Sequence, residues 1–500
     1  MTESSEASPL SAASSDKSPG HALRKELRLR DLVPMQVLLV VGIFPAGIAA
    51  HQGSTHVVSW LLGVTLLLMP VAAVVHYCVE IWPLEGGVYQ WTRHTMGALV
   101  GFLAAWNLAA YFLLIISNLG ILTAASLSYG LGPRAAWMAD SRAFITGLNL
   151  GLFALIFLVN IPGFGIGRWV SHVGTALMLL VTALLLILTF VHPHATRAHP
   201  HLSLQPPFSL SFPLITLLSV NLISKIAFNG LTGLEQVAVF AGETRDAART
   251  ILRSAWIAAP GIALIYIVMT GALLTYTPAD SIDLTGPIPQ VLAAAFAGGD
   301  VSAGAIDWGG ALSRIAILAL AVAQVAQYAV IVAETSRLPM VAGWDHLIPV
   351  WFTRLHPRFR TPTRSLSVIV LLAVLFCCLA SAGAGTQEAF QLIVTSANVC
   401  QGIYYLLMFA VPWVAGSRWC LQPGLKPSAL VRIASVCGIA VTLLATIFNF
   451  VPIVEVPKPW LFALKVGLAT LGANLIGAAV YWRGSRTTRR QEPPFSPAVV

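Results

Sequence analysis

Residues 40–48 of the sequence read Val-Val-Gly-Ile-Phe-Pro-Ala-Gly-Ile, and residues 227–235 read Ala-Phe-Asn-Gly-Leu-Thr-Gly-Leu-Glu. Each stretch interrupts the middle of a long apolar segment, 32–51 in the first case and 213–240 in the second. Pro45 removes a backbone donor, and the glycines in both stretches lower the cost of leaving the helical conformation. We therefore expect two helices that are broken near their midpoints.

The composition places these helices in a membrane. Hydrophobic residues make up 57% of the 500 residues and charged residues only 10%, less than half of what a soluble chain needs to cover its surface. We expect an all-α integral membrane protein with twelve transmembrane helices, because twelve apolar segments are long enough to cross a hydrocarbon core about 30 Å thick. The segments are 32–51, 57–79, 97–128, 143–160, 169–191, 213–240, 254–276, 312–335, 365–382, 388–415, 430–451 and 460–482.

The basic residues predict the orientation. With the N-terminus inside, 22 of the 29 Lys and Arg residues fall on the cytoplasmic side, where basic residues of membrane proteins accumulate. We expect a multi-pass protein of the plasma membrane with both termini in the cytoplasm. The net charge of +9 is then explained by orientation and by attraction to anionic lipid. No nucleic-acid partner is expected, because the chain has no basic domain outside the bilayer.

The two predicted breaks have a chemical consequence. Unpaired backbone at membrane depth is tolerated where it lines a cavity or binds a ligand. Broken helices at matching positions of two inverted repeats mark a binding site at the membrane midplane in secondary transporters. Free N–H groups suit a carboxylate and free carbonyls suit an ammonium group, and an α-amino acid carries both. A plain kink in each helix is the alternative, since Gly and Pro are common in membrane helices.

Further motifs accompany the breaks. Residues 228–251 run from Phe-Asn-Gly-Leu-Thr-Gly-Leu-Glu through Gly-Glu-Thr-Arg to Arg-Thr-Ile, and residues 83–91 read Pro-Leu-Glu-Gly-Gly-Val-Tyr-Gln-Trp. Residues 336–358 contain Ser-Arg-Leu, Gly-Trp-Asp, Leu-Ile-Pro and His-Pro-Arg. With these motifs in this order, the chain resembles the amino acid–polyamine–organocation (APC) superfamily of permeases over nearly its whole length. It departs from the family pattern at 42–47, where Gly-Ile-Phe-Pro-Ala-Gly replaces Gly-Ser-Gly-Ile-Phe, and at 246–247, where Asp-Ala replaces Asn-Pro.

The resemblance implies that backbone in both breaks contacts a small-molecule substrate, although the departure at 42–47 leaves the register of the first break open. Two polar side chains in other spans, Trp106 and Gln324, are further candidates for lining the cavity. The predicted substrate-binding residues are Ile43, Phe44, Pro45, Ala46, Gly47, Phe228, Asn229, Gly230, Leu231, Thr232, Trp106 and Gln324.

Two ionisable residues in the second broken segment have an alternative interpretation each. Lys225 lies one turn before Asn229, so its amine can take the place of a coupling cation and make transport independent of sodium. Its alternative is a structural lysine bonded to carbonyls at the break. Glu235 matches the family's glutamate, and a buried carboxylate can carry protons as a coupling or gating group. Its alternative is a hydrogen bond that packs two helices.

No catalytic residue, cofactor or metal site is expected. The spans lack convergent catalytic side chains, and no CxxC pair occurs among the six cysteines. The histidines of the loop 192–201 lack the spacing of a closed metal site. A membrane-embedded enzyme is therefore the less favoured class.

We expect a secondary transporter with two inverted five-helix repeats, which imports an amino acid or related amine by alternating access, coupled to protons and independent of sodium. A polyamine or organocation carrier and an amino acid exchanger are the alternatives within transport. The sequence does not identify the substrate or the oligomeric state. The predicted parts are a disordered cytoplasmic tail at 1–31, the repeats at 32–202 and 203–415, two helices at 416–484 and a cytoplasmic tail at 485–500.

Overall fold

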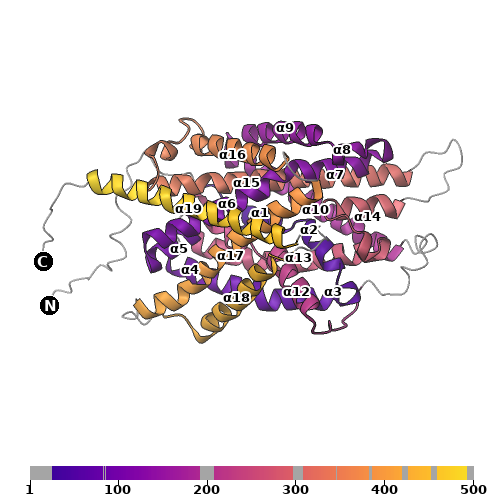
Figure 1. Ribbon diagram of the computed structural model, residues 1–500, viewed down its shortest axis with the longest axis horizontal. Helices are drawn as coiled ribbons and strands as arrows, with labels where there is room; N and C mark the ends of the chain where they lie inside the picture. Colours follow the sequence, from indigo (N-terminus) through magenta and orange to yellow (C-terminus); the bar gives the residue numbers. More distant parts are fainter. Residues whose placement is uncertain are drawn as a thin grey trace.

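The computed structural model describes residues 25–82, 84, 86–191, 208–296, 308–344, 346–381, 386–418, 426–451 and 459–491. Over these residues the chain folds into helices, most of which lie side by side in one bundle (Figure 1). The helices are α1 (Leu29–Val40), α2 (Phe44–Ala50), η2 (Gly53–Thr55), α3 (His56–Gly63), η3 (Val64–Leu68), α4 (Met69–Ile81), α5 (Val88–Met96), α6 (Ala98–Ser117), α7 (Leu119–Leu131), η4 (Pro133–Ala135), α8 (Trp137–Asp140), α9 (Arg142–Asn160), α10 (Phe164–Val191), α12 (Leu217–Gly230), η6 (Gln236–Glu243), α13 (Ala247–Tyr276), η7 (Ala279–Ser281), α14 (Pro287–Phe296), α15 (Trp308–Trp344), η8 (Val350–Thr353), α16 (Thr363–Ser381), α17 (Thr386–Arg418), α18 (Ala429–Phe448) and α19 (Pro459–Gln491).

The helices confirm an all-α membrane protein that crosses the bilayer many times. In the described part of the chain, nine helical stretches are long and apolar enough to span a membrane, and the bent pair of α1 and α2 makes a tenth if it is counted as one span. These ten match ten of the twelve predicted segments. The other two predicted segments correspond to α12 with η6 and to α16, which are not among the stretches that meet this test.

Both predicted helix breaks are present. The axes of α1 and α2 meet at an angle of 52°, and Pro45 lies in the first turn of α2, where a proline costs no hydrogen bond. The second break follows Gly230, the last residue of α12, and the chain then passes through Gly233 with φ of +113° before η6 begins. Only glycine adopts that backbone conformation without strain.

The two breaks lie side by side. A side-chain β-carbon built on Gly230 would come within 3.2 Å of the Pro45 β-carbon, and one built on Gly233 would come within 3.2 Å of Val40. The packing of α2 against α12 holds the two segments together. The unwound backbone of one helix therefore faces the unwound backbone of the other.

The helix packing has the arrangement that an inverted five-helix repeat predicts. The third span packs along the tenth (α6 on α17), and correspondingly the eighth packs along the fifth (α15 on α10). The first packs on the seventh (α1 on α13), and the sixth packs on the second (α12 on α3). In each of these two comparisons, shifting both spans of the first contact by five places in the order of the ten spans gives the second contact. This relation is expected for two related halves. The predicted boundary between the halves, at 202 and 203, lies outside the described residues.

The last two helices lie outside this core. α18 packs on α17, α4 and α12, and α19 packs on α17 and α6. Their outward faces carry exposed apolar side chains, such as Leu430 and Ile433 on α18 and Leu468 and Leu475 on α19. Such faces suit contact with lipid tails rather than with water.

The end of the predicted N-terminal tail is part of the fold. Leu27 forms a short parallel bridge with Thr244, and the N–H groups of Glu26 and Leu27 donate to the Glu243 carbonyl at 2.9 and 3.0 Å. This bridge lies next to η6 and the C-terminal half of α15. We refer to the region where these three parts come together as "the η6 end" of the bundle. The residues before Lys25, the last residues of the C-terminal tail and the histidine-containing loop 192–201 lie outside the described residues.

Candidate functional site

The first break leaves two backbone donors without a partner. The N–H of Gly42 donates to the Tyr266 hydroxyl at 3.0 Å, and that hydroxyl in turn donates to the Val40 carbonyl at 2.9 Å. The N–H groups of Ile43 and Phe44 form no hydrogen bond within the described part of the chain. A buried N–H without a partner is costly, so these two donors suit an anionic ligand group.

The second break leaves two backbone acceptors without a partner. The N–H of Leu231 still donates to the Ala227 carbonyl at 2.9 Å, whereas the N–H of Gly233 turns away to the Tyr405 hydroxyl at 2.8 Å. The carbonyls of Asn229 and Gly230 therefore accept no hydrogen bond from any described residue. Free carbonyls at the C-terminal end of a helix suit a cationic ligand group.

The polar side chains at the second break are used within the protein. The Thr232 hydroxyl donates to the Phe228 carbonyl at 2.7 Å and accepts from the Gln401 amide at 2.9 Å. The Asn229 amide donates to the Lys225 carbonyl at 2.9 Å, and its oxygen accepts from Asn398 at 2.8 Å. Backbone rather than side-chain groups thus remain for a ligand here.

Aromatic side chains wall the two breaks. Trp60 lies against Gly230, stacks on Tyr266 with ring centroids 4.4 Å apart and donates to the Thr270 hydroxyl at 3.0 Å. Phe44 packs edge-on against Phe390, with ring centroids 5.3 Å apart. The rings of Trp60, Tyr266 and Phe390 are buried, and an apolar surrounding strengthens any charge–dipole contact made there.

Glu235 is held by three donors. Its carboxylate accepts from the hydroxyls of Tyr404 and Tyr405 on α17 at 3.0 and 2.6 Å and from the Gly233 N–H at 3.2 Å. The side chain is 1% exposed. These hydrogen bonds are those expected if Glu235 packs two helices together, and they connect α17 to the second broken segment.

Lys225 meets a carbonyl, but not at either break. Its Nζ donates to the Val451 carbonyl, just past the end of α18, at 2.6 Å. The side chain is 2% exposed. A carbonyl partner is what the structural interpretation of Lys225 predicts. The position of that carbonyl differs from the prediction, which placed it at the helix break.

Trp106 and Gln324 form their hydrogen bonds with helices other than the broken ones. The Trp106 ring donates to the Ala473 carbonyl on α19 at 2.8 Å, and Gln324 accepts from the Ser126 hydroxyl on α7 at 3.4 Å. The glutamine that reaches the first break is Gln327, one turn further along α15, which donates to the Val41 carbonyl at 3.0 Å. Gln327 is not among the predicted substrate-binding residues, because its sequence position does not distinguish it from Gln324.

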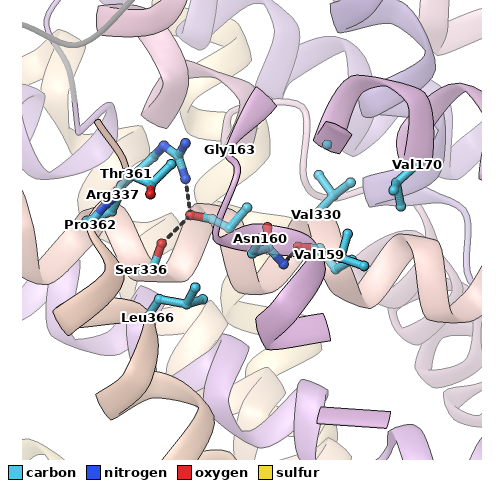
Figure 2. Close-up of a pocket in the computed structure, with 13 residues that line it drawn as sticks. Val159, Asn160, Gly163, Val170, Val330, Ser336, Arg337, Thr361, Pro362 and Leu366 are labelled. Atoms are coloured by element: carbon cyan, nitrogen blue, oxygen red, sulfur yellow. Dashed lines mark hydrogen bonds between the residues drawn. The ribbon is translucent and has the colours of Figure 1, made fainter. Parts of the chain in front are cut away.

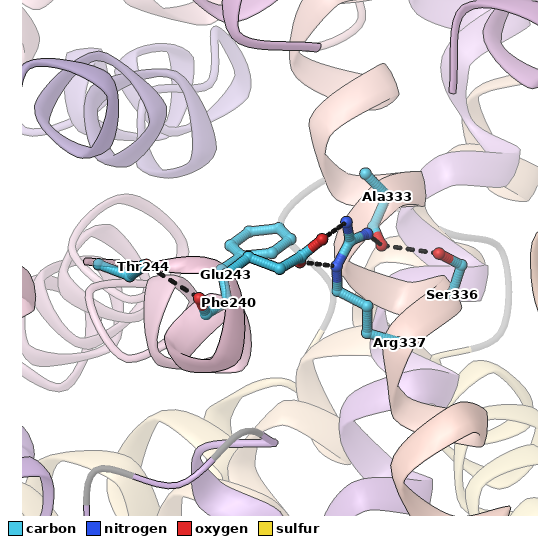
Figure 3. Close-up of polar contacts among 6 residues, drawn as sticks. All are labelled: Phe240, Glu243, Thr244, Ala333, Ser336 and Arg337. Carbon is cyan, nitrogen blue, oxygen red and sulfur yellow. Dashed lines mark hydrogen bonds and ion pairs between the residues drawn. The ribbon is translucent and has the colours of Figure 1, made fainter. Parts of the chain in front are cut away.

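A buried ion pair closes the η6 end. Arg337 on α15 donates to both Glu243 oxygens, at 2.5 and 2.9 Å, and also to the Ala333 carbonyl at 2.5 Å (Figure 3). The guanidinium lies over the Phe240 ring, 4.9 Å from its centroid. The pair connects the far half of the second broken segment to α15, so it has to open if these two elements separate.

Arg337 also lines a pocket between α9, α10, α15 and α16 (Figure 2). Its polar lining includes Asn160, Ser336 and Thr361, and the Asn160 amide donates to the Ala329 carbonyl at 3.1 Å. This pocket is not at the two breaks. Among the described residues, no group of His, Cys, Asp and Glu side chains has the arrangement of a metal site.

Comparisons with known proteins agree with this architecture. A family described as "Amino acid permease" matches residues 33–470. An uncharacterized transporter of Mycobacterium tuberculosis (strain ATCC 25618 / H37Rv) is 24% identical over 94% of this chain and 93% of its own. The serine/threonine exchanger SteT of Bacillus subtilis (strain 168) is 23% identical over 80% and 85%, and the branched-chain amino acid permease BcaP of the same organism is 21% identical over 71% and 73%.

A solved structure shows the same fold. The crystal structure of MhsT in complex with L-phenylalanine aligns with a TM-score of 0.62 at 13% sequence identity, and the match covers 86% of this chain and 99% of that one. Both helix breaks lie within the residues that the family match covers.

Proposed function

The chain belongs to the amino acid permease family and is a transporter, and from this premise we propose that it imports an amino acid or a related amine by alternating access. The observation that supports this substrate class is the pairing of the two breaks. The free N–H groups of Ile43 and Phe44 lie in one break, and the free carbonyls of Asn229 and Gly230 lie in the other. A ligand with a carboxylate at one end and an ammonium at the other would satisfy both sets.

The names of the relatives support amino acids as the substrate class. Two of them are named for amino acids, one as an exchanger and one as a permease. An exchange mechanism is therefore the second candidate for this chain. Counterflow separates the two, because an exchanger requires internal substrate whereas a gradient-driven importer does not. We also propose that the transporter lies in the plasma membrane with both termini in the cytoplasm, as the distribution of basic residues predicts.

The substrate class can be tested with the purified protein. We expect at least one of the twenty amino acids or common polyamines to raise the melting temperature, because a ligand that binds only the folded state at 100 times its Kd stabilises it by about 2.7 kcal/mol. The same compound should then enter proteoliposomes as a radiolabelled substrate. Stabilisation by a sugar or a nucleobase, and by none of these compounds, would contradict the proposal.

We further propose that transport is coupled to protons and does not use sodium. The Val40 and Val41 carbonyls at the first break already accept hydrogen bonds from Tyr266 and Gln327. A bound cation would need such oxygens for itself. Glu235 supplies a buried carboxylate that takes part in the coupling, and Lys225 supplies a buried amine in the second broken segment.

Uptake should change less than about twofold, or about 0.4 kcal/mol, when external sodium is replaced by choline. The Val40 and Val41 carbonyls each already accept one hydrogen bond, which competes with binding of the ion. Initial uptake rates into proteoliposomes provide the measurement, and a tenfold rise with sodium would refute the proposal.

Lys225→Met separates the two interpretations of that lysine. Lost uptake with an unchanged melting temperature indicates a coupling charge, and a lowered melting temperature indicates a structural role.

A further inference from the structure

Glu334 on α15 is a buried carboxyl group that neither the motifs nor the proposed substrate site involve. Its side chain is 0% exposed, and neither carboxylate oxygen has a hydrogen-bond partner among the residues that the structure describes. Burying an ionised carboxylate without donors costs several kcal/mol, and such a group avoids that cost by binding a proton. The geometry around Glu334 therefore favours its neutral form.

The neighbouring carboxylate of Glu235 is also buried, but unlike that of Glu334 it has hydrogen-bond partners. Glu235 interacts electrostatically with Glu334, and Tyr111 on α6 interacts with both. Glu235 accepts three hydrogen bonds, from Tyr404, Tyr405 and the Gly233 N–H, and donors of this kind stabilise an ionised carboxylate. Two nearby buried carboxyl groups are not both charged without a large repulsion, so the pair divides into one anion and one acid.

The nearby positive charge does not neutralise Glu334. Arg337 interacts with Glu334 electrostatically, but its guanidinium is already paired with Glu243 through two hydrogen bonds. The other ionisable groups on elements packed against α15 include a pair formed by Asp31 on α1 and His172 on α10, whose side chains approach to 3.2 Å. Further groups on these elements are Arg168 on α10, Arg364 on α16, Tyr129 on α7 and Tyr328 on α15 itself.

We propose that Glu334, rather than Glu235, binds the transported proton, and that Glu235 contributes to the coupling as the fixed anion beside it. This rests on the proposed function in so far as the proton accompanies the substrate. A proton from external water joins the Glu334 carboxylate to form an O–H bond, and the same bond breaks when the proton passes to cytoplasmic water. Arg337 lies three residues further along α15, about 4.5 Å along the helix axis. Opening the Arg337–Glu243 pair therefore exposes Glu334 to the η6 end.

Infrared spectroscopy of the purified protein tests the proton site without any substrate. The wild-type protein should show the C=O stretch of a protonated carboxyl group near neutral pH, and Glu334→Gln should remove it. Glu80→Gln is the matched control, because the Glu80 side chain is 71% exposed and lies at the end of α4; it should leave the band unchanged. A band that persists in Glu334→Gln, or that is missing from the wild type, would overturn the proposal.

Transport tests the coupling. The probe is an equimolar mixture of the twenty carbon-14-labelled amino acids, offered to proteoliposomes that are one pH unit more alkaline inside. With one proton per substrate, the wild type should accumulate label about tenfold, whereas Glu334→Gln should exchange label in counterflow but accumulate none. Glu334→Asp keeps a carboxyl group and should restore part of the accumulation. Glutamine has the shape of the protonated acid, so the variant should fold.

The outcomes separate this inference from the function it rests on. Wild-type accumulation that Glu334→Gln leaves unchanged would refute the role of Glu334 and keep the transporter as proposed. Amino acid uptake in the wild type that ignores the pH gradient would refute proton coupling, and with it the transported proton on Glu334. If no amino acid enters or exchanges at all, the proposed substrate class is wrong, and the infrared result alone then decides whether Glu334 holds a proton.

Discussion

Arg337→Ala should lower the free energy of unfolding by about 3–5 kcal/mol and nearly abolish uptake. The Arg337 and Glu243 side chains are 4% and 7% exposed, so removing the arginine leaves a buried carboxylate without its partner. The lost contact also frees the far half of the second broken segment from α15. The free energy of unfolding is measured by denaturing the detergent-solubilised protein with increasing SDS. Transport activity is measured as uptake into proteoliposomes.

A matched arginine distinguishes the ion pair from a general effect of charge. Arg354 is exposed and lies between η8 and α16, so Arg354→Ala should change stability by less than about 0.5 kcal/mol. The double variant Arg337→Met with Glu243→Met should regain most of the stability, because neither charge is then buried alone, but it should not regain uptake if the pair has to close and open. A loss below about 1 kcal/mol in Arg337→Ala would show that the pair contributes little to folding.

Gly230→Ala should reduce uptake about 5- to 150-fold, the equivalent of 1–3 kcal/mol of overpacking. The new β-carbon would lie 2.7 Å from Trp60 Cη2 and 3.2 Å from the Pro45 β-carbon. Trp60 has little freedom to withdraw, because it stacks on Tyr266 and donates to Thr270. The substitution thus separates the two breaks without altering any group that could carry charge.

A double-mutant cycle with Trp60→Phe tests whether the contact with Trp60 causes the loss of uptake. Trp60→Phe removes the part of the indole ring that the new β-carbon would contact. The double variant should recover uptake relative to Gly230→Ala alone, since the clash is then absent. Gly261→Ala is the control, because apart from the adjacent residues and the backbone of its own helix no atom lies within 4 Å of the added β-carbon. Equal losses in Gly230→Ala and the double variant would place the effect in the backbone rather than in the contact with Trp60.

The broken helices and the spans could be predicted because they depend on local composition. Pro45, Gly230 and Gly233 lower the cost of leaving the helical conformation through their own backbone chemistry. Apolar length alone identified ten segments that meet the test for a membrane span. It also marked α16 almost to the residue, as Thr363–Ser381 against the predicted 365–382.

The partners of the breaks could not be predicted in the same way. In an apolar span, a polar residue's sequence position does not reveal which neighbouring helix it meets. Gln324 and Gln327 are one turn apart on α15, and only the packing decides that Gln327 meets the Val41 carbonyl. Trp106 likewise turns toward α19. The hydroxyls of Tyr404 and Tyr405 converge on Glu235 across a long sequence distance, and no motif marked them.

The bridge between Leu27 and Thr244 also constrains the order in which the protein is made. The two residues are 217 positions apart (244 − 27), and the Arg245 N–H donates back to the Leu27 carbonyl at 3.0 Å. A ribosome adding about 5–20 residues per second needs roughly 10–40 s to cover that distance. The start of the first helix therefore leaves the ribosome long before its partner exists. The bridge forms only after nearly half of the chain has been synthesised, so a truncated early product would lack it.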